Sequence, residues 1–356
     1  MKMRLKAVLM VLLASLLIYG NMWVFASGDD KEEKRKNNPR KYTEEKLSEK
    51  DIQDFEQAIK EKDKLIRENS LKLDKETGSI INKYAADKSK NYEDIAASDL
   101  KEEKISAMYA IIDVYPNVEE KEQKLLKYYF NKYSPYAGDE YLKEYGETNF
   151  AAPVSILSAD TGNYDRSLAV TYAYDHYDSY SSDYPDMNLI GGDCANFISQ
   201  CLHEGGIPMD NAGGWYIYPK VSNPVNRVAD INEFNANWDA ADPSPWVSAV
   251  EFNTYWGSSA VNTYEYDDQY YVDNTATVYR EPLYTGDAVQ LLKQFLWWYE
   301  GYHTMIITSY GTDDEGDSDY LVSYHTNDQV DKSLDWVTDQ FMGSGGSYKV
   351  KFFDIN

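Results

Sequence analysis

The chain of 356 residues is long enough for a targeting segment and one or two domains with sizeable cores. Two cysteines cannot form the disulfide framework of a small secreted scaffold, so stability must come from an ordinary apolar core. The net charge of −25 is concentrated in residues 151–356, where 8 basic side chains face 31 acidic ones, and this excludes nucleic acid as a partner of that half.

The first 27 residues have the pattern of a secretory signal peptide. Lys2, Arg4 and Lys6 precede an apolar run over residues 7–19, and small residues around Ala26 follow it. The run is short for a membrane span of about 20 residues, so cleavage is favoured over an uncleaved anchor. We therefore expect a secreted or cell-envelope-associated protein whose N-terminal segment contacts the membrane before cleavage.

Residues 28–42 are almost wholly charged and polar, which predicts a disordered tether. Residues 43–150 follow as a helical accessory module, because three segments carry apolar side chains at three- and four-residue spacings. Pro116 should end one helix, and Asn117 with Glu120 has capping-box spacing for the next. From residue 134 to 153 the chain is expected to form a loop.

Residues 151–356 are predicted to form a single α+β domain. A helix is expected at 164–176 and another after Gly191, and strand-like segments follow at 287–292, 304–310, 320–324 and 348–353. Helices followed by strands with intervening turns favour a mostly antiparallel sheet. The acidic stretch 313–319 lacks the final Glu of a calcium loop, so it is interpreted as a hairpin turn.

The stretch GGDCANFISQCLHEGG, residues 191–206, contains both cysteines. Asp193 is placed to cap a helix that ends at Gly205, so Cys194 would be its first residue. The positive end of the helix dipole stabilises an anion there, which favours a reactive thiolate. Cys201 lies about 10.5 Å further along the helix, beyond the disulfide limit of about 7 Å, and is interpreted as a core residue. The thiols are too few for a zinc site, and neither a metal nor a cofactor is expected.

A base for Cys194 must come from four histidines: His176, His203, His303 and His325. His203 falls on the opposite side of the cysteine helix, and His176 lies in a polar, tyrosine-rich stretch. His303 begins an apolar strand-like run. A helix-start cysteine and a distant strand-start histidine are the arrangement that nucleophilic cysteine enzymes use.

A third polar group should orient the base, and the segment SYHTND offers three side chains of the right type: His325, Asn327 and Asp328. The spacing alone does not choose between them. Tryptophans near these motifs are expected to wall a substrate cleft, namely Trp215, Trp246 and Trp298.

These segments together resemble a known family. The stretch GGDCANFISQCLHEGGIPM, with YDRSLAVTYA before it and GDAVQ, His303 and HTND after it, is similar to the bacterial putative amidase-domain family. That family is related to the papain-like NlpC and CHAP cysteine hydrolases. The resemblance covers about residues 160–340 and implies a papain-like domain in which the nucleophile helix packs on an antiparallel sheet.

The resemblance also implies roles for individual residues. Cys194 matches the nucleophile and His303 the base. His325 is favoured as the third residue because NlpC-like relatives use a second histidine there, with Asn327 as the alternative. Asn188 lies where papain-like enzymes carry a side-chain amide that helps to hold the oxyanion, and the backbone N–H of Cys194 is a further donor.

The predicted function is therefore a secreted cysteine amidase or peptidase. It would hydrolyse an amide bond of cell-wall peptide, or of another peptide or amide, through an acyl-enzyme on Cys194. Two alternatives stay open: a transamidase with the same dyad, and a catalytically inactive wall-binding module. The helical module is hypothesised to position or cover the catalytic cleft.

Overall fold

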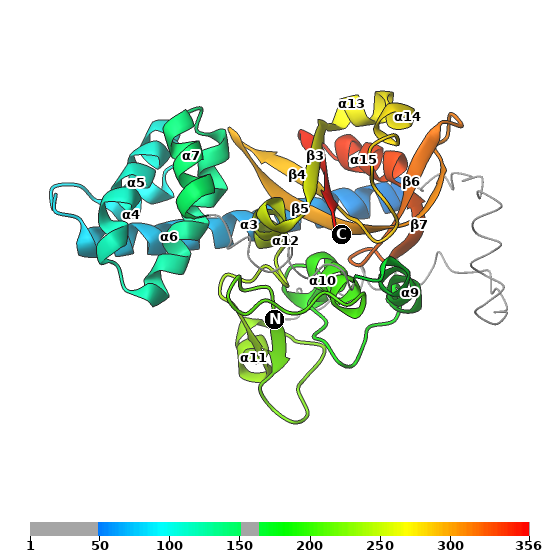
Figure 1. Ribbon diagram of the computed structural model, residues 1–356, viewed down its shortest axis with the longest axis horizontal. Helices are drawn as coiled ribbons and strands as arrows, with labels where there is room; N and C mark the ends of the chain where they lie inside the picture. Colours follow the sequence, from blue (N-terminus) through cyan, green and yellow to red (C-terminus); the bar gives the residue numbers. More distant parts are fainter. Residues whose placement is uncertain (1–48, 151–163, 356) are drawn as a thin grey trace.

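The computed structural model describes residues 49–150 and 164–355. A helical module comes first, and helices with a six-stranded antiparallel sheet follow, so the fold is α+β as predicted (Figure 1). The predicted signal peptide and tether lie outside the described residues. Within the two described ranges, no helix is both long enough and apolar enough to cross a membrane.

Five helices build the N-terminal part: α3 (Glu49–Tyr84), α4 (Tyr92–Ala97), α5 (Lys101–Val114), α6 (Glu120–Tyr133) and α7 (Glu140–Asn149). Helix α3 is longer than the module itself. Figure 1 shows it leaving the other helices and continuing behind the sheet. Its two halves therefore belong to different cores, with Ile81 packed among the module helices and Ile59 packed against the sheet.

Two local predictions for the module were wrong. The capping box at Asn117 is not formed, because residues Tyr115–Asn117 make a 3-10 turn and Glu119 takes the cap position of α6 without a side-chain bond. The expected loop at 134–153 contains α7. Asp139 caps that helix by accepting hydrogen bonds from the backbone N–H groups of Tyr141 and Leu142.

The main sheet has the strand order β3 (Asn262–Asp267), β8 (Tyr348–Asp354), β4 (Ala288–Phe295), β5 (Trp298–Thr312), β6 (Ser318–Tyr324) and β7 (Gln329–Ser333). Every neighbouring pair is antiparallel. The four predicted strand segments are β4, β5, β6 and β8, and the acidic stretch 313–319 forms the turn between β5 and β6. A separate two-stranded sheet pairs β1 (Ile217–Pro219) with β2 (Trp238–Ala240) and lies beside α11 (Ile231–Asn237).

Helices cover both faces of the main sheet (Figure 1). One face packs against α9 (Arg166–His176), α10 (Cys194–Glu204) and α12 (Ala249–Ser259). The other face packs against α13 (Asp268–Asp273), α14 (Thr275–Val278), α15 (Leu334–Gly343) and the first half of α3. Side chains of β5 alternate between the two cores, with Ile306 facing α10 while Met305 and Ile307 face α15.

The module is joined to the sheet through the start of β5. Trp298 belongs to the core of the module and meets the ring of Tyr133 edge-on at 5.1 Å between centroids. Two buried ion pairs lie beside it: Lys132 with Glu300 at 2.7 Å, and Lys104 with Asp74 at 2.9 Å.

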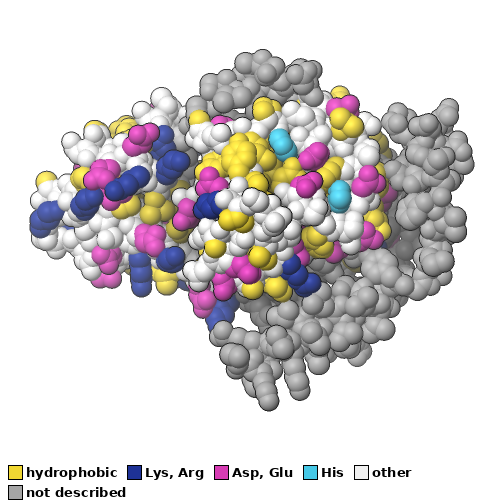
Figure 2. Space-filling view, turned by 90° about the horizontal axis from the view of Figure 1, so that it is seen from below, with side chains coloured by type: hydrophobic (Ala, Val, Ile, Leu, Met, Phe, Trp, Pro, Cys, Tyr) yellow, Lys and Arg dark blue, Asp and Glu magenta, His cyan; other side chains and the backbone are white. Residues whose placement is uncertain are grey.

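The charge asymmetry of the sequence is visible on the surface. On the face shown in Figure 2, basic side chains gather over the helical module at the left. This agrees with the sequence, in which 27 of the 35 lysines and arginines precede residue 151.

Candidate functional site

Cys194 is the first residue of α10, and 4% of its surface is exposed. The chain enters this helix through Gly191 and Gly192, whose φ angles of 127° and 113° disfavour residues with a Cβ. The thiol therefore lies at the positive end of the helix dipole. Cys201, seven residues later, is also a free thiol, and burial raises its pKa well above the usual value.

Asp193 occupies the N-cap position of α10, but its carboxylate makes no capping hydrogen bond, contrary to expectation. The carboxylate is instead engaged elsewhere. One oxygen accepts hydrogen bonds from the Met187 backbone N–H and from Asn196 Nδ2, and the other lies 2.6 Å from His325 Nδ1. The N–H of Asp193 donates to Thr326 Oγ1 at 2.7 Å. These bonds tie the start of the cysteine helix to the segment after β6.

His325 is buried on the α10 side of the sheet, where its ring stacks on Phe197 at 3.8 Å between centroids. Its Nε2–H donates to the His176 carbonyl oxygen at 2.7 Å. Burial lowers the pKa of His325, but the hydrogen bond and charge of Asp193 outweigh it, and the pKa is raised overall. Both ring nitrogens are thus engaged, so in this structure His325 holds the start of α10 and contacts Asp193 instead of orienting His303.

His303 lies in β5 with 2% of its surface exposed. Its ring stacks on Phe341 at 5.2 Å and meets Tyr324 edge-on at 4.6 Å. Burial, with a contribution from the positive charge of Lys62, holds the pKa of His303 well below its ordinary value. Its Nε2 has no hydrogen-bond partner among the described residues. His303 is therefore a neutral imidazole with a nitrogen free to act as a base.

The start of α10 lies close to the part of β5 that carries His303. Strand β6 ends at Tyr324, and Thr326, which binds Asp193, follows beyond that end. Burial raises the pKa of Tyr302, the neighbour of His303, and Cys194 is among the nearby charges that add to the rise. Within the described residues no hydrogen bond joins the thiol to His303; catalytic hydrogen bonds often form only once substrate is bound.

The remaining predicted polar residues lie around this centre. Asn188 is half-buried in the 3-10 turn Asn188–Ile190, and its Oδ1 lies 3.5 Å from Thr326 Oγ1. Asn327 is exposed in the turn after β6, with a φ of 73° that asparagine tolerates well. Their catalytic roles stay predictions.

The structure places two of the predicted cleft tryptophans, Trp215 and Trp246, in the core beneath α10, fully buried. The Trp246 indole N–H donates to Asn196 Oδ1, and that of Trp215 donates to Ser199 Oγ, each at 3.0 Å. They brace the cysteine helix from behind. Sequence reasoning missed this support, although polar residues inside an otherwise apolar helix were its signal.

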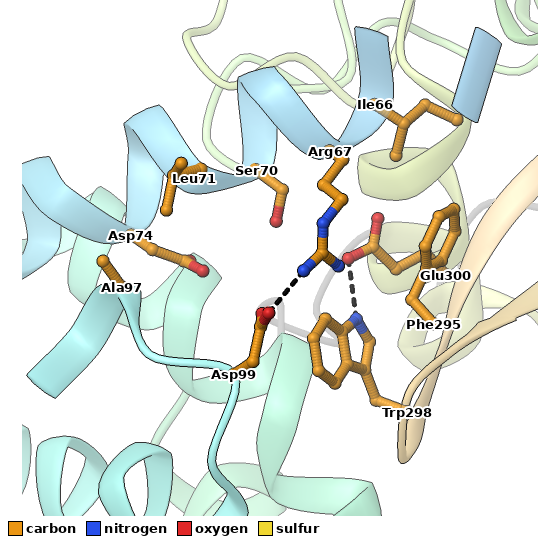
Figure 3. Close-up of a pocket in the computed structure, with 10 residues that line it drawn as sticks. All are labelled: Ile66, Arg67, Ser70, Leu71, Asp74, Ala97, Asp99, Phe295, Trp298 and Glu300. Atoms are coloured by element: carbon orange, nitrogen blue, oxygen red, sulfur yellow. Dashed lines mark hydrogen bonds and ion pairs between the residues drawn. The ribbon is translucent and has the colours of Figure 1, made fainter. Parts of the chain in front are cut away.

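Trp298, the third predicted cleft residue, lines a cavity of about 150 Å³ between α3 and the β4–β5 hairpin. Figure 3 shows the Arg67 side chain extending into it between Asp99 and Glu300. Neither Cys194 nor His303 lines this cavity. In the described part of the chain, no three His, Cys, Asp or Glu side chains are grouped so that they could hold a metal ion.

Comparison with known proteins gives one family. The model of the family described as "Putative amidase domain" matches residues 163–348, just over half of the chain, a range that contains α9, α10 and both buried histidines. No curated protein and no solved structure matches the chain.

Proposed function

We propose that this chain, which belongs to the putative amidase-domain family, is a cysteine-dependent enzyme that hydrolyses an amide bond through an acyl-enzyme on Cys194. The family match supports the amide as the bond attacked. The observation that carries the cysteine mechanism is a thiol at the start of α10 near a buried, neutral histidine on β5. A neutral imidazole is the form that can remove the thiol proton.

The proposed reaction uses the groups described above. His303 takes the proton from Cys194, and the thiolate attacks the amide carbon. The backbone N–H of Cys194 stabilises the oxyanion, with the Asn188 amide as a second candidate donor. His303 then returns the proton to the leaving amine, and water hydrolyses the thioester. The pair of Asp193 and His325 fixes the position of the nucleophile.

The proposed substrate is a cell-wall peptide, and the proposed location is outside the cell membrane. The signal-like pattern of residues 1–27 supports export, and the acidity of residues 151–356 disfavours acidic polymers as ligands. A transamidase is the second candidate, because a dyad as buried as this one limits the access of water to the thioester. Mass spectrometry of products formed with an added amine distinguishes the two reactions.

The decisive test is the rate of iodoacetamide alkylation at Cys194 between pH 5 and 10, with Cys201 as the internal control. We expect Cys194 to react well below pH 8 and faster than Cys201, and to lose this reactivity in His303→Ala. If both cysteines stay inert until the protein is denatured, the mechanism is wrong. Binding of wall by Cys194→Ala, with no turnover by wild type, would then favour a binding module.

A further inference from the structure

The dyad is closed to substrate in this structure. Cys194 and His303 are 4% and 2% exposed, whereas attack requires the amide carbon about 3–3.5 Å from the sulfur. A covering element must therefore be displaced before the proposed reaction. The groups beside His303 come from three elements: Phe341 of α15, Tyr324 of β6, and Lys62 of α3.

The first half of α3 lies directly on Tyr302, the neighbour of His303. The Tyr302 hydroxyl donates to the Ile59 carbonyl oxygen at 3.3 Å, and Ile59 is buried in the same core. Lys62 Nζ lies 4.6 Å from the centroid of the Tyr302 ring. Asp63 forms an ion pair with Lys293 of β4, whose side chain is 7% exposed, with N–O distances of 2.6 and 2.8 Å.

Of the covering elements, this half of α3 is the most weakly held. Among its described side chains up to Ile66, Ile59 is the one that is buried. Helix α15, by contrast, buries four side chains, and β6 is paired on both edges. A helix end with so little buried surface opens locally at low cost.

Departure of α3 would leave a prepared surface beside His303. Lys293 would lose its carboxylate partner while staying between the rings of Tyr302 and Tyr348, at 4.9 and 5.4 Å from their centroids. In the β4–β5 pairing, Leu291 is opposite His303, and Lys293 lies two residues from Leu291. Side chains two residues apart share a face, so Lys293 faces the same side of the sheet as His303.

We propose that Ile59–Asp63 of α3 occupies a substrate subsite and that Lys293 is the residue that binds a substrate carboxylate there. The ligand class is a peptide with an apolar side chain near a free carboxylate, the two groups that Ile59 and Asp63 present from the chain itself. Substrate and α3 compete for this surface, so α3 restrains the enzyme. The proposal rests on the proposed function.

The test breaks the Asp63–Lys293 pair from either end and measures Cys194 alkylation with N-iodoacetylglycine and with its amide. Asp63→Asn and Lys293→Gln should both react faster with the amide probe than wild type, because α3 is released in both. Asp63→Asn, which keeps the lysine, should prefer the acid probe about tenfold more than Lys293→Gln does, as expected of a hydrogen bond between charged groups. Glu68→Gln, in an exposed pair on the same helix, is the matched control and should behave as wild type.

Each outcome is decisive. Unchanged rates in both variants would show that α3 does not restrict access, and equal acid-to-amide ratios would remove Lys293 from the subsite. If Cys194 is inert to every probe in the native protein, the proposed function fails, and hydrogen exchange decides the subsite separately. N-acetylglycine, but not its amide, should then speed exchange of the backbone amides of residues 59–66; no such effect would overturn the subsite.

Discussion

Replacing Lys132 by Met should weaken the junction between the helical module and the sheet. Lys132 in α6 and Glu300 in β5 form an ion pair at 2.7 Å in which both side chains are 2% exposed. The Trp298 indole N–H donates to the same oxygen of Glu300. Methionine keeps most of the length and volume of lysine, so the substitution chiefly removes the charge and leaves Glu300 buried without its cation.

Loss of one partner from a buried pair costs about 3–5 kcal/mol in the free energy of unfolding. At about 2–4 °C per kcal/mol for a protein of this size, the melting temperature should fall by about 6–20 °C. The cost should also depend on pH. Burial raises the pKa of Glu251 to about 7, and the charge of Lys132 is one of the groups that restrain this rise.

The sign of the pH effect follows from proton binding. A carboxyl group whose pKa is raised in the folded state holds more protons there than in the unfolded chain, so stability falls as pH rises towards the folded pKa. Without Lys132 the pKa of Glu251 rises further and this loss extends above pH 7. The cost of Lys132→Met should therefore be greater at pH 8 than at pH 5.5.

Urea unfolding followed by tryptophan fluorescence at the two pH values measures this cost. Lys132→Met/Glu300→Gln should recover most of it, since the unpaired charge is gone. Lys121→Met, in an exposed pair with Glu119, is the control and should show no measurable change. A cost below about 1 kcal/mol at pH 8, or one independent of pH, would refute the assignment of Lys132 as a buried countercharge.

Three further substitutions test the support of the site. The pKa of His325 is raised by Asp193, so the pair stabilises the fold below pH 6.5 and is lost as pH rises through the folded pKa. His325→Gln should thus melt below wild type at pH 6 and converge with it at pH 9; a constant difference would contradict this. Gly301→Ala would place a Cβ 2.0 Å from the Ala249 carbonyl oxygen, and unfolding in urea should show a loss of at least about 1–3 kcal/mol; unchanged stability would exclude this close approach. Trp246→Phe removes the donor to a buried amide oxygen, which should cost about 1–3 kcal/mol in the same assay, and a cost near zero would show that this bond is dispensable.

The fold elements that the sequence predicts well are those with strong local signals. Strands β4, β5, β6 and β8 combine apolar runs with turn residues, and α10 has glycines at both ends. Strands β3 and β7 were missed because they are edge strands with mostly half-exposed or exposed, polar side chains. Such strands owe their structure to a neighbouring strand more than to their own residues.

The candidate site divides in the same way. The sequence identifies the types of side chain that could perform the chemistry, because a helix-start cysteine and a strand-start histidine leave local traces. It does not identify the Asp193–His325 pair, whose members are 132 residues apart and each have other plausible partners. The covering of Tyr302 by Lys62 is likewise a tertiary contact, which periodicity in α3 alone cannot locate.

The placement of Trp298 in the core of the helical module has a consequence for synthesis on the ribosome. The other buried members of that core end at Phe150, so the module emerges about 150 residues before the side chain that completes it. At about 5–20 residues per second, its core waits about 7–30 s for that side chain. Because the same strand carries His303, the event that closes the module also delivers the histidine, and the nascent chain assembles its site only after nearly all of it has been made.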